Sequence, residues 1–172
     1  MEKNIVLIGM PGVGKSSIGV VLAKVLGMAF IDSDIVIQQE TGHTLRELIE
    51  ELGTEGFLAL EDRINAEIDA KNTVIATGGS AVFGVNAMEK FRKTGIIVYL
   101  AADYENLIGR FSDLDDRGVV HSEGQTLKDV FDQRSRLYEK YAHITVWQKS
   151  SDFRMEEIIN TIIDNIKTTT DR

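Results

Sequence analysis

The sequence predicts an α/β protein in which strands and helices alternate around a parallel sheet. Short, continuous apolar runs such as residues 96–100 are typical of strands buried on both faces of a parallel sheet. The segments between these runs carry apolar residues at helical spacing. This alternation implies βαβ crossovers and a three-layer α/β/α sandwich.

Local signals place the individual elements. We expect strands of the same doubly buried kind over residues 3–9, 29–31, 74–76, 96–100 and 144–146. We expect helices over residues 15–26, 45–52, 55–70, 103–111, 126–141 and 152–167. Gly27 should end the first helix, and Thr44 with Glu47 has the spacing of a capping box.

Length and composition narrow the class of protein. A chain of 172 residues with 43% hydrophobic content predicts one domain over residues 1–172 with a real core. The net charge of −8 argues against a nucleic-acid partner, and the lack of cysteine excludes disulfides and thiolate chemistry. We see no membrane span, signal peptide or sign of a protein partner, so we expect a cytoplasmic monomer.

Residues 9–16 read Gly-Met-Pro-Gly-Val-Gly-Lys-Ser and follow an apolar run. This is the GxxxxGK[ST] pattern of a phosphate-binding loop between a buried strand and a helix. Backbone N–H groups and the helix N-terminus would cradle phosphates, Lys15 would reach the β- and γ-phosphates, and the Ser16 hydroxyl would bind Mg²⁺. The nucleotide-binding residues expected here are Gly12, Val13, Gly14, Lys15, Ser16 and Ser17.

Two aspartates follow the second predicted strand. Asp32 and Asp34 are spaced by two, which would put both carboxylates on one side of an extended chain. In a parallel sheet this strand end lies at the same edge as the phosphate-binding loop. One carboxylate could hold the Mg²⁺ shell and the other could orient or deprotonate a hydroxyl. The alternative is a helix N-cap for residues 35–40.

Two further loops could complete a site. Thr77-Gly78-Gly79-Ser80 follows the third strand, and paired glycines there permit close approach of a ligand, although an ordinary strand-to-helix turn would fit as well. Residues 112–125 are polar and lack periodicity, which favours a mobile lid.

Taken in order, these motifs resemble the shikimate kinase family. The resemblance covers residues 3–160 and rests on GMPGVGKSSIG, DSD at 32–34, ETG at 40–42, ATGGS at 76–80, an arginine in the lid and RSRLY at 134–138. It implies a five-stranded parallel sheet of the nucleoside-monophosphate-kinase type. It also implies transfer of the γ-phosphate of ATP, with Mg²⁺, to the 3-hydroxyl of shikimate, in the pathway to the aromatic amino acids.

The resemblance also implies roles for single residues. Asp32 would support Mg²⁺ with Ser16, and Asp34 would bind the shikimate hydroxyls. Backbone of Gly78 and Gly79 would face the substrate, and Arg134 would pair with its carboxylate. In the lid, Arg117 would close over the phosphates, and Arg110 would lie near the adenine. The catalytic residues would therefore be Lys15, Asp34 and Arg117. Without the resemblance, Arg117 could be a solvated loop charge and Arg134 a surface helix residue.

The sequence departs from the family pattern in the segment before Glu61. Leu58 stands where the family has the second arginine of the carboxylate clamp, and Ser80 replaces a third glycine. Arg63 lies five residues further on, about 140° around the helix, and cannot substitute. The alternatives are a kinase for another small hydroxyl compound and a nucleotide-binding module without catalysis.

Overall fold

The computed structural model describes residues 3–108, 119–148 and 154–170. Five strands form one sheet in the order β2-β3-β1-β4-β5, and every neighbouring pair is parallel. The strands are β1 Asn4–Ile8, β2 Ala29–Asp32, β3 Thr73–Ala76, β4 Gly95–Ala102 and β5 Ile144–Gln148. The described helices are α1 Lys15–Leu26, α2 Ser33–Thr41, α3 Leu45–Glu67, the 3₁₀ turn η1 Ala81–Phe83, α4 Val85–Thr94, α5 Tyr104–Ile108, α6 Leu127–Tyr141 and α7 Met155–Thr170.

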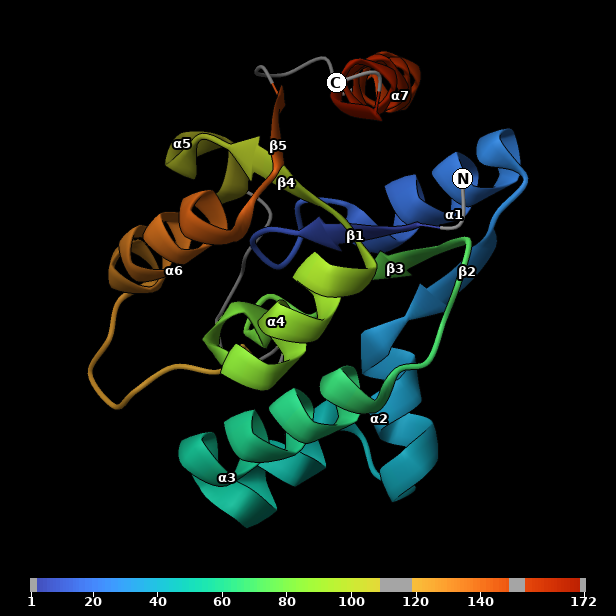
Figure 1. Cartoon of the computed structure of the whole chain (residues 1–172). Helices are drawn as coiled ribbons and strands as arrows, with labels where there is room; N and C mark the ends of the chain where they lie inside the picture. Colours follow the sequence, from blue (N-terminus) through green and yellow to red (C-terminus); the bar gives the residue numbers. More distant parts are fainter. Residues whose placement is uncertain (1–2, 109–118, 149–153, 171–172) are drawn as a thin grey trace.

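Helices cover both faces of the sheet, as Figure 1 shows. On one face, α1 packs on β1, β2 and β3, and α7 packs on β5 and against α1. On the other face, α4 packs on β1 and β4, and α6 packs on β4. The predicted α/β/α sandwich with a five-stranded parallel sheet is therefore confirmed.

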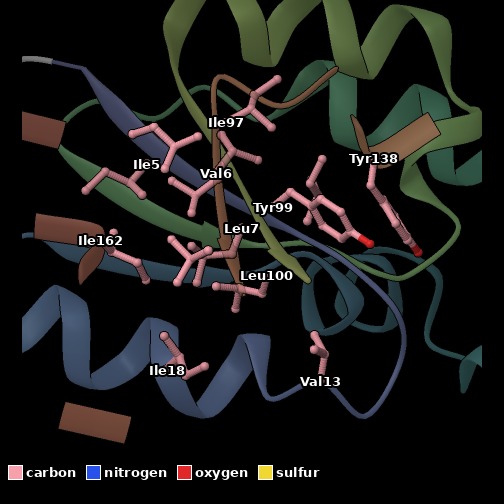
Figure 2. Close-up of a cluster of buried hydrophobic side chains, with 14 of the residues drawn as sticks. Ile5, Val6, Leu7, Val13, Ile18, Ile97, Tyr99, Leu100, Tyr138 and Ile162 are labelled. Carbon is pink, nitrogen blue, oxygen red and sulfur yellow. The ribbon is translucent and has the colours of Figure 1, made fainter. Parts of the chain in front are cut away.

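The main core lies between these layers and centres on β1 and β4. Figure 2 shows Ile18 of α1 and Ile162 of α7 beside Leu7, whereas Tyr138 of α6 lies next to Tyr99. The two tyrosine rings have their centroids 5.1 Å apart. All residues of β1 and β4 are buried, as continuous apolar runs predict.

The prediction that all five strands are buried on both faces was wrong for β2 and β5. Burial alternates along β5, and β2 has no fully buried residue. These two strands form the edges of the sheet, so each lacks a neighbouring strand on one side.

Most predicted helix signals are confirmed. Gly27 ends α1 in the left-handed conformation, with a φ of 67°, and Thr44 and Glu47 form both bonds of a capping box. The helical stretches expected on either side of residue 53 form α3, which is kinked where Gly53 has a φ of 71°. No helix in the described ranges is both long and apolar enough to cross a membrane.

Helix α4 was not predicted, and its N-terminus explains why. The N-cap is Gly84, which has no side chain to cap the helix. Instead, Asp62 of α3 accepts hydrogen bonds from the Ala87 N–H (2.7 Å) and from Asn86 Nδ2 (2.8 Å). A capping group supplied by another helix leaves no local sequence signal.

We expect Asp62→Ala to lower the free energy of unfolding by about 1–2 kcal/mol, because it removes the acceptor that caps α4. Urea denaturation followed by circular dichroism measures this change. Glu89→Ala, an exposed change on the same helix, is the control and should have little effect. Equal stabilities of Asp62→Ala and the parent protein would contradict this assignment.

Candidate active site

A cavity of about 620 Å³ opens at the carboxyl ends of the strands. This is the edge at which open α/β sheets bind their ligands. It is lined by Pro11, Gly12, Gly14, Lys15, Ser16, Ser17, Asp34, Leu45, Phe57, Glu61, Thr77, Gly78, Gly79, Ser80, Val119, Val120 and Arg134. Loops after β1 and β3 therefore share one cavity with the first turn of α2 and with α3 and α6.

The loop between β1 and α1 presents its lysine to the cavity. Lys15 is buried, and its Nζ donates hydrogen bonds to the carbonyl oxygens of Gly9 (2.8 Å) and Met10 (2.9 Å). Burial lowers the pKa of Lys15 to about 8, while the charge of Asp34 acts in the opposite direction. Gly12 and Gly14 adopt positive φ angles of 77° and 97°, which L-residues rarely reach.

Val13 is the one predicted nucleotide-binding residue of this loop that does not line the cavity. Its side chain is buried in the main core (Figure 2). Its N–H donates to the Met10 carbonyl over 3.3 Å, and its own carbonyl accepts from Gln148 Nε2 over 2.7 Å. Val13 therefore anchors the loop to the core and to the end of β5.

Asp32 links the end of the phosphate-binding loop to the first turn of α2. Ser16 Oγ donates to Asp32 Oδ2 over 2.6 Å, and Asp32 Oδ1 accepts from the Asp34 N–H over 3.0 Å. The second bond is the N-cap of α2, so the capping alternative is correct for Asp32, although the helix begins at Ser33. The paired oxygens of Ser16 and Asp32 fit Mg²⁺, which prefers oxygen ligands and keeps several waters when it binds with phosphates.

The expectation that Asp32 and Asp34 lie along an extended chain was wrong. Asp32 ends β2, and Asp34 already belongs to the first turn of α2. The helical turn sends Asp34 into the cavity lining and leaves Asp32 beside Ser16. Burial raises the pKa of Asp34, the charge of Asp32 raises it further, and Lys15 opposes both.

The paired glycines after β3 allow close contacts that a side chain would block. A Cβ at Gly78 would lie 2.7 Å from Asp34 Oδ1, and one at Gly79 would lie 2.6 Å from Pro11 Cδ. The Gly78 N–H donates to Ser33 Oγ over 3.2 Å, which ties this loop to α2. The two glycines therefore pack closely against Asp34, Glu61 and Pro11.

Arg134 of α6 is almost fully buried and lines the cavity. It donates a hydrogen bond to the Val120 carbonyl and lies 5.7 Å from the ring of Phe83. One turn further along α6, the Tyr138 hydroxyl donates to the Gly79 carbonyl over 2.6 Å. The surface alternative for Arg134 was therefore wrong.

Arg110 and Arg117 lie outside the described residues, as do residues 112–118 of the predicted lid over 112–125. The described end of this segment lines the cavity through Val119 and Val120. Its His121 carbonyl accepts a hydrogen bond from Thr54 Oγ1 of α3 over 3.2 Å.

Leu58 is not part of the cavity lining. It packs against a second hydrophobic cluster, built around Ile37, Leu48, Phe57, Ile64 and Val120. On the same helix, Arg63 points to the surface and pairs with Glu40 (2.8 Å) and Glu67 (3.0 Å). Arg63 thus supplies no charge to the cavity, as its angular position predicts.

Three polar lining residues, Glu61, Thr77 and Ser80, were not predicted as site residues. Glu61 of α3 is buried in the cavity wall and accepts a hydrogen bond from Ser80. The sequence does contain a signal for Glu61, because it lies four residues after Phe57 and therefore on the same helix face. Its partner Ser80 directly follows the paired glycines.

A phosphate-binding loop at a helix N-terminus, beside two aspartates at the edge of a parallel sheet, defines the class of P-loop kinases. The family model described as Shikimate kinase matches residues 11–167. The chain is 35% identical over 167 residues to the shikimate kinase of Clostridium botulinum (strain Eklund 17B / Type B), with 96% of this chain and 100% of the relative covered.

A second relative and a solved structure also match this chain over almost its whole length. The shikimate kinase of Persephonella marina is 30% identical over 166 residues, which is 96% of this chain and 99% of the relative. The solved structure of shikimate kinase from Acinetobacter baumannii in complex with shikimate is 31% identical, with a TM-score of 0.87 and coverage of 98% of this chain and 95% of that chain. The chain belongs to the shikimate kinase family.

We expect Tyr138→Phe to lower the free energy of unfolding by about 1–2 kcal/mol, because the partly buried Gly79 carbonyl loses its donor. Chemical denaturation measures the loss. Tyr141→Phe, on the same helix and half-buried, is the matched control and should be close to neutral. If both variants lose the same stability, the bond to Gly79 contributes nothing of its own.

Proposed function

We propose that the protein transfers the γ-phosphate of ATP to the 3-hydroxyl of shikimate. The observation that carries this proposal is that Lys15, Asp34 and Arg134 line one cavity although they come from α1, α2 and α6. A cation for phosphates, an acceptor for a hydroxyl and a cation for a carboxylate are the groups this reaction needs. Family membership and the shikimate complex of a relative support the same acceptor.

In the proposed mechanism, the loop and the N-terminus of α1 hold the phosphates of ATP through residues 12–17. Lys15 exchanges its hydrogen bonds to the Gly9 and Met10 carbonyls for bonds to phosphate oxygens. Ser16 and Asp32 would hold Mg²⁺, which neutralises phosphate charge when bound. Following the family, Arg117 would close over the phosphates, and Arg110 would lie near the adenine.

In the same cavity, Asp34 accepts a hydrogen bond from the 3-hydroxyl of shikimate and orients its oxygen toward the γ-phosphorus. Backbone of Gly78 and Gly79 faces the substrate, and Arg134 pairs with its carboxylate. A bond forms between the 3-oxygen and the γ-phosphorus while the bond to the β–γ bridging oxygen breaks, which releases ADP. The hydroxyl proton leaves toward Asp34, whose raised pKa makes it a better acceptor than an exposed aspartate.

ADP release in the presence of Mg-ATP and shikimate tests this proposal. We expect turnover that depends on shikimate, and we expect Asp34→Asn to lower kcat by about 10²- to 10⁴-fold because it loses the proton acceptor. Asp69→Asn, an exposed change in the loop after α3, is the control and should keep full activity. ATP binding without shikimate-dependent turnover would contradict the proposal and would call for a screen of other hydroxyl acids.

Position 58 provides a separate test of the acceptor. If Leu58 replaces the second arginine of the carboxylate clamp, Leu58→Arg should lower the KM for shikimate by about 10-fold or more, because it adds a charge-assisted hydrogen bond. Leu58→Met controls for the loss of the leucine side chain from the second hydrophobic cluster. An unchanged or higher KM in Leu58→Arg would show that position 58 does not serve the acceptor site.

A further inference from the structure

A buried hydrogen bond joins α3 to the loop after β3 in the wall of the cavity. Ser80 Oγ donates to Glu61 Oε2 over 2.6 Å, and the two residues are 6% and 2% exposed. The other carboxylate oxygen, Glu61 Oε1, is buried without a hydrogen-bond partner among the described residues. Among the described residues, the Ser80 hydroxyl is thus the one hydrogen-bond donor to the Glu61 carboxyl group.

Glu61 lies beside Gly78, the first of the paired glycines, and lines the same cavity. A Cβ at Gly78 would be 2.7 Å from Glu61 Oε1 and equally close to Asp34 Oδ1, so both carboxylates flank Gly78. The charged groups that face Glu61 are Asp34 of α2, Arg134 of α6 and Lys15 of α1. None of the ion pairs found in the described ranges includes Glu61.

The charge of Glu61 therefore changes close to neutral pH. The pKa of Glu61 is raised to about 7: burial and the charge of Asp34 raise it, whereas the Ser80 hydrogen bond, Arg134 and Lys15 lower it. Below this value Glu61 is neutral, and above it the cavity wall carries a second negative charge beside Asp34. That charge opposes the attraction between Arg134 and an anionic acceptor.

We propose that Ser80 is a positioning residue for the acceptor: its hydrogen bond holds the Glu61 carboxyl group against Gly78 and thereby tunes how tightly an anionic acceptor binds at Arg134. The proposal rests on the proposed function, because it concerns the acceptor of that same site. The acceptor would then lie near two carboxylates, Asp34 and Glu61, and one guanidinium, Arg134. Such a balance suits a ligand with one carboxylate and several hydroxyl donors.

The dependence of KM on pH tests the effect on the acceptor. In the parent protein the KM for shikimate should rise by about tenfold between pH 6 and pH 8, as Glu61 ionises. In Ser80→Ala this rise should move to higher pH by about one unit, because the hydrogen bond that favours the charged form is gone. Ser80→Thr, which keeps the hydroxyl, should restore the parent profile, and Glu61→Gln should abolish the rise.

A merely structural role for Ser80 would change other quantities. In that case Ser80→Ala would lose stability or kcat but would keep the midpoint of the KM profile, and this result would overturn the proposal. The KM for ATP serves as the internal control, and its pH profile should be the same in Ser80→Ala and in the parent protein.

A direct titration of Glu61 separates this inference from the proposed function. The ¹³C resonance of the Glu61 carboxyl group, identified by its loss in Glu61→Gln, should titrate near pH 7 and should shift upward by about one unit in Ser80→Ala. The same midpoint in both proteins would overturn the role of Ser80, whatever the substrate is. If Ser80→Ala shifts the titration but the parent protein does not turn over shikimate, the proposed function and the acceptor part of this inference fail together.

Discussion

The site depends on the parallel pairing of β1 with β3 and of β3 with β2. Parallel strands end at the same edge of a sheet, so the loops after these three strands lie side by side. The Thr77 N–H and hydroxyl both donate to the Leu7 carbonyl, which fixes the glycine loop against the end of β1 (3.2 and 2.9 Å). Residues that are distant in sequence thereby come to line one cavity.

The second constraint is electrostatic. The chain carries a net charge of −8, yet it buries Lys15 and Arg134 in the cavity wall. Burial of a charge is costly unless the charge is paired or hydrogen-bonded. Both cations bond to backbone carbonyls, and both lie near Glu61, while Lys15 also lies near Asp34. A cavity that holds two cations and two carboxylates can bind phosphates at one end and a hydroxyl acid at the other.

The sequence predicted those features whose signals are local. A phosphate-binding loop, a capping box and three fully buried interior strands each leave a signature in consecutive residues, and all are present in the structure. Features that depend on packing between elements were not predicted. Helix α4 is capped by Asp62 from α3, and the bond between Ser80 and Glu61 exists only because α3 packs beside the loop after β3.

The two aspartates show the limit of a local pattern. Their spacing correctly marked the strand end, but the helix begins at Ser33, two residues earlier than an extended chain through Asp34 would allow. Asp34 reached the cavity through the helical turn, and Asp32 became both the cap and the partner of Ser16. Likewise, helical periodicity alone could not show that Arg134 is buried, because its neighbours come from η1 and the loop before α6.

A crystal structure with Mg-ADP and shikimate tests most directly whether the cavity is the kinase site. We expect the β-phosphate against Lys15, the shikimate carboxylate against Arg134 and its 3-hydroxyl within hydrogen-bond distance of Asp34. Shikimate bound away from Arg134 and Asp34, or a cavity filled by nucleotide alone at saturating shikimate, would contradict the assignment of this cavity as the site of phosphate transfer.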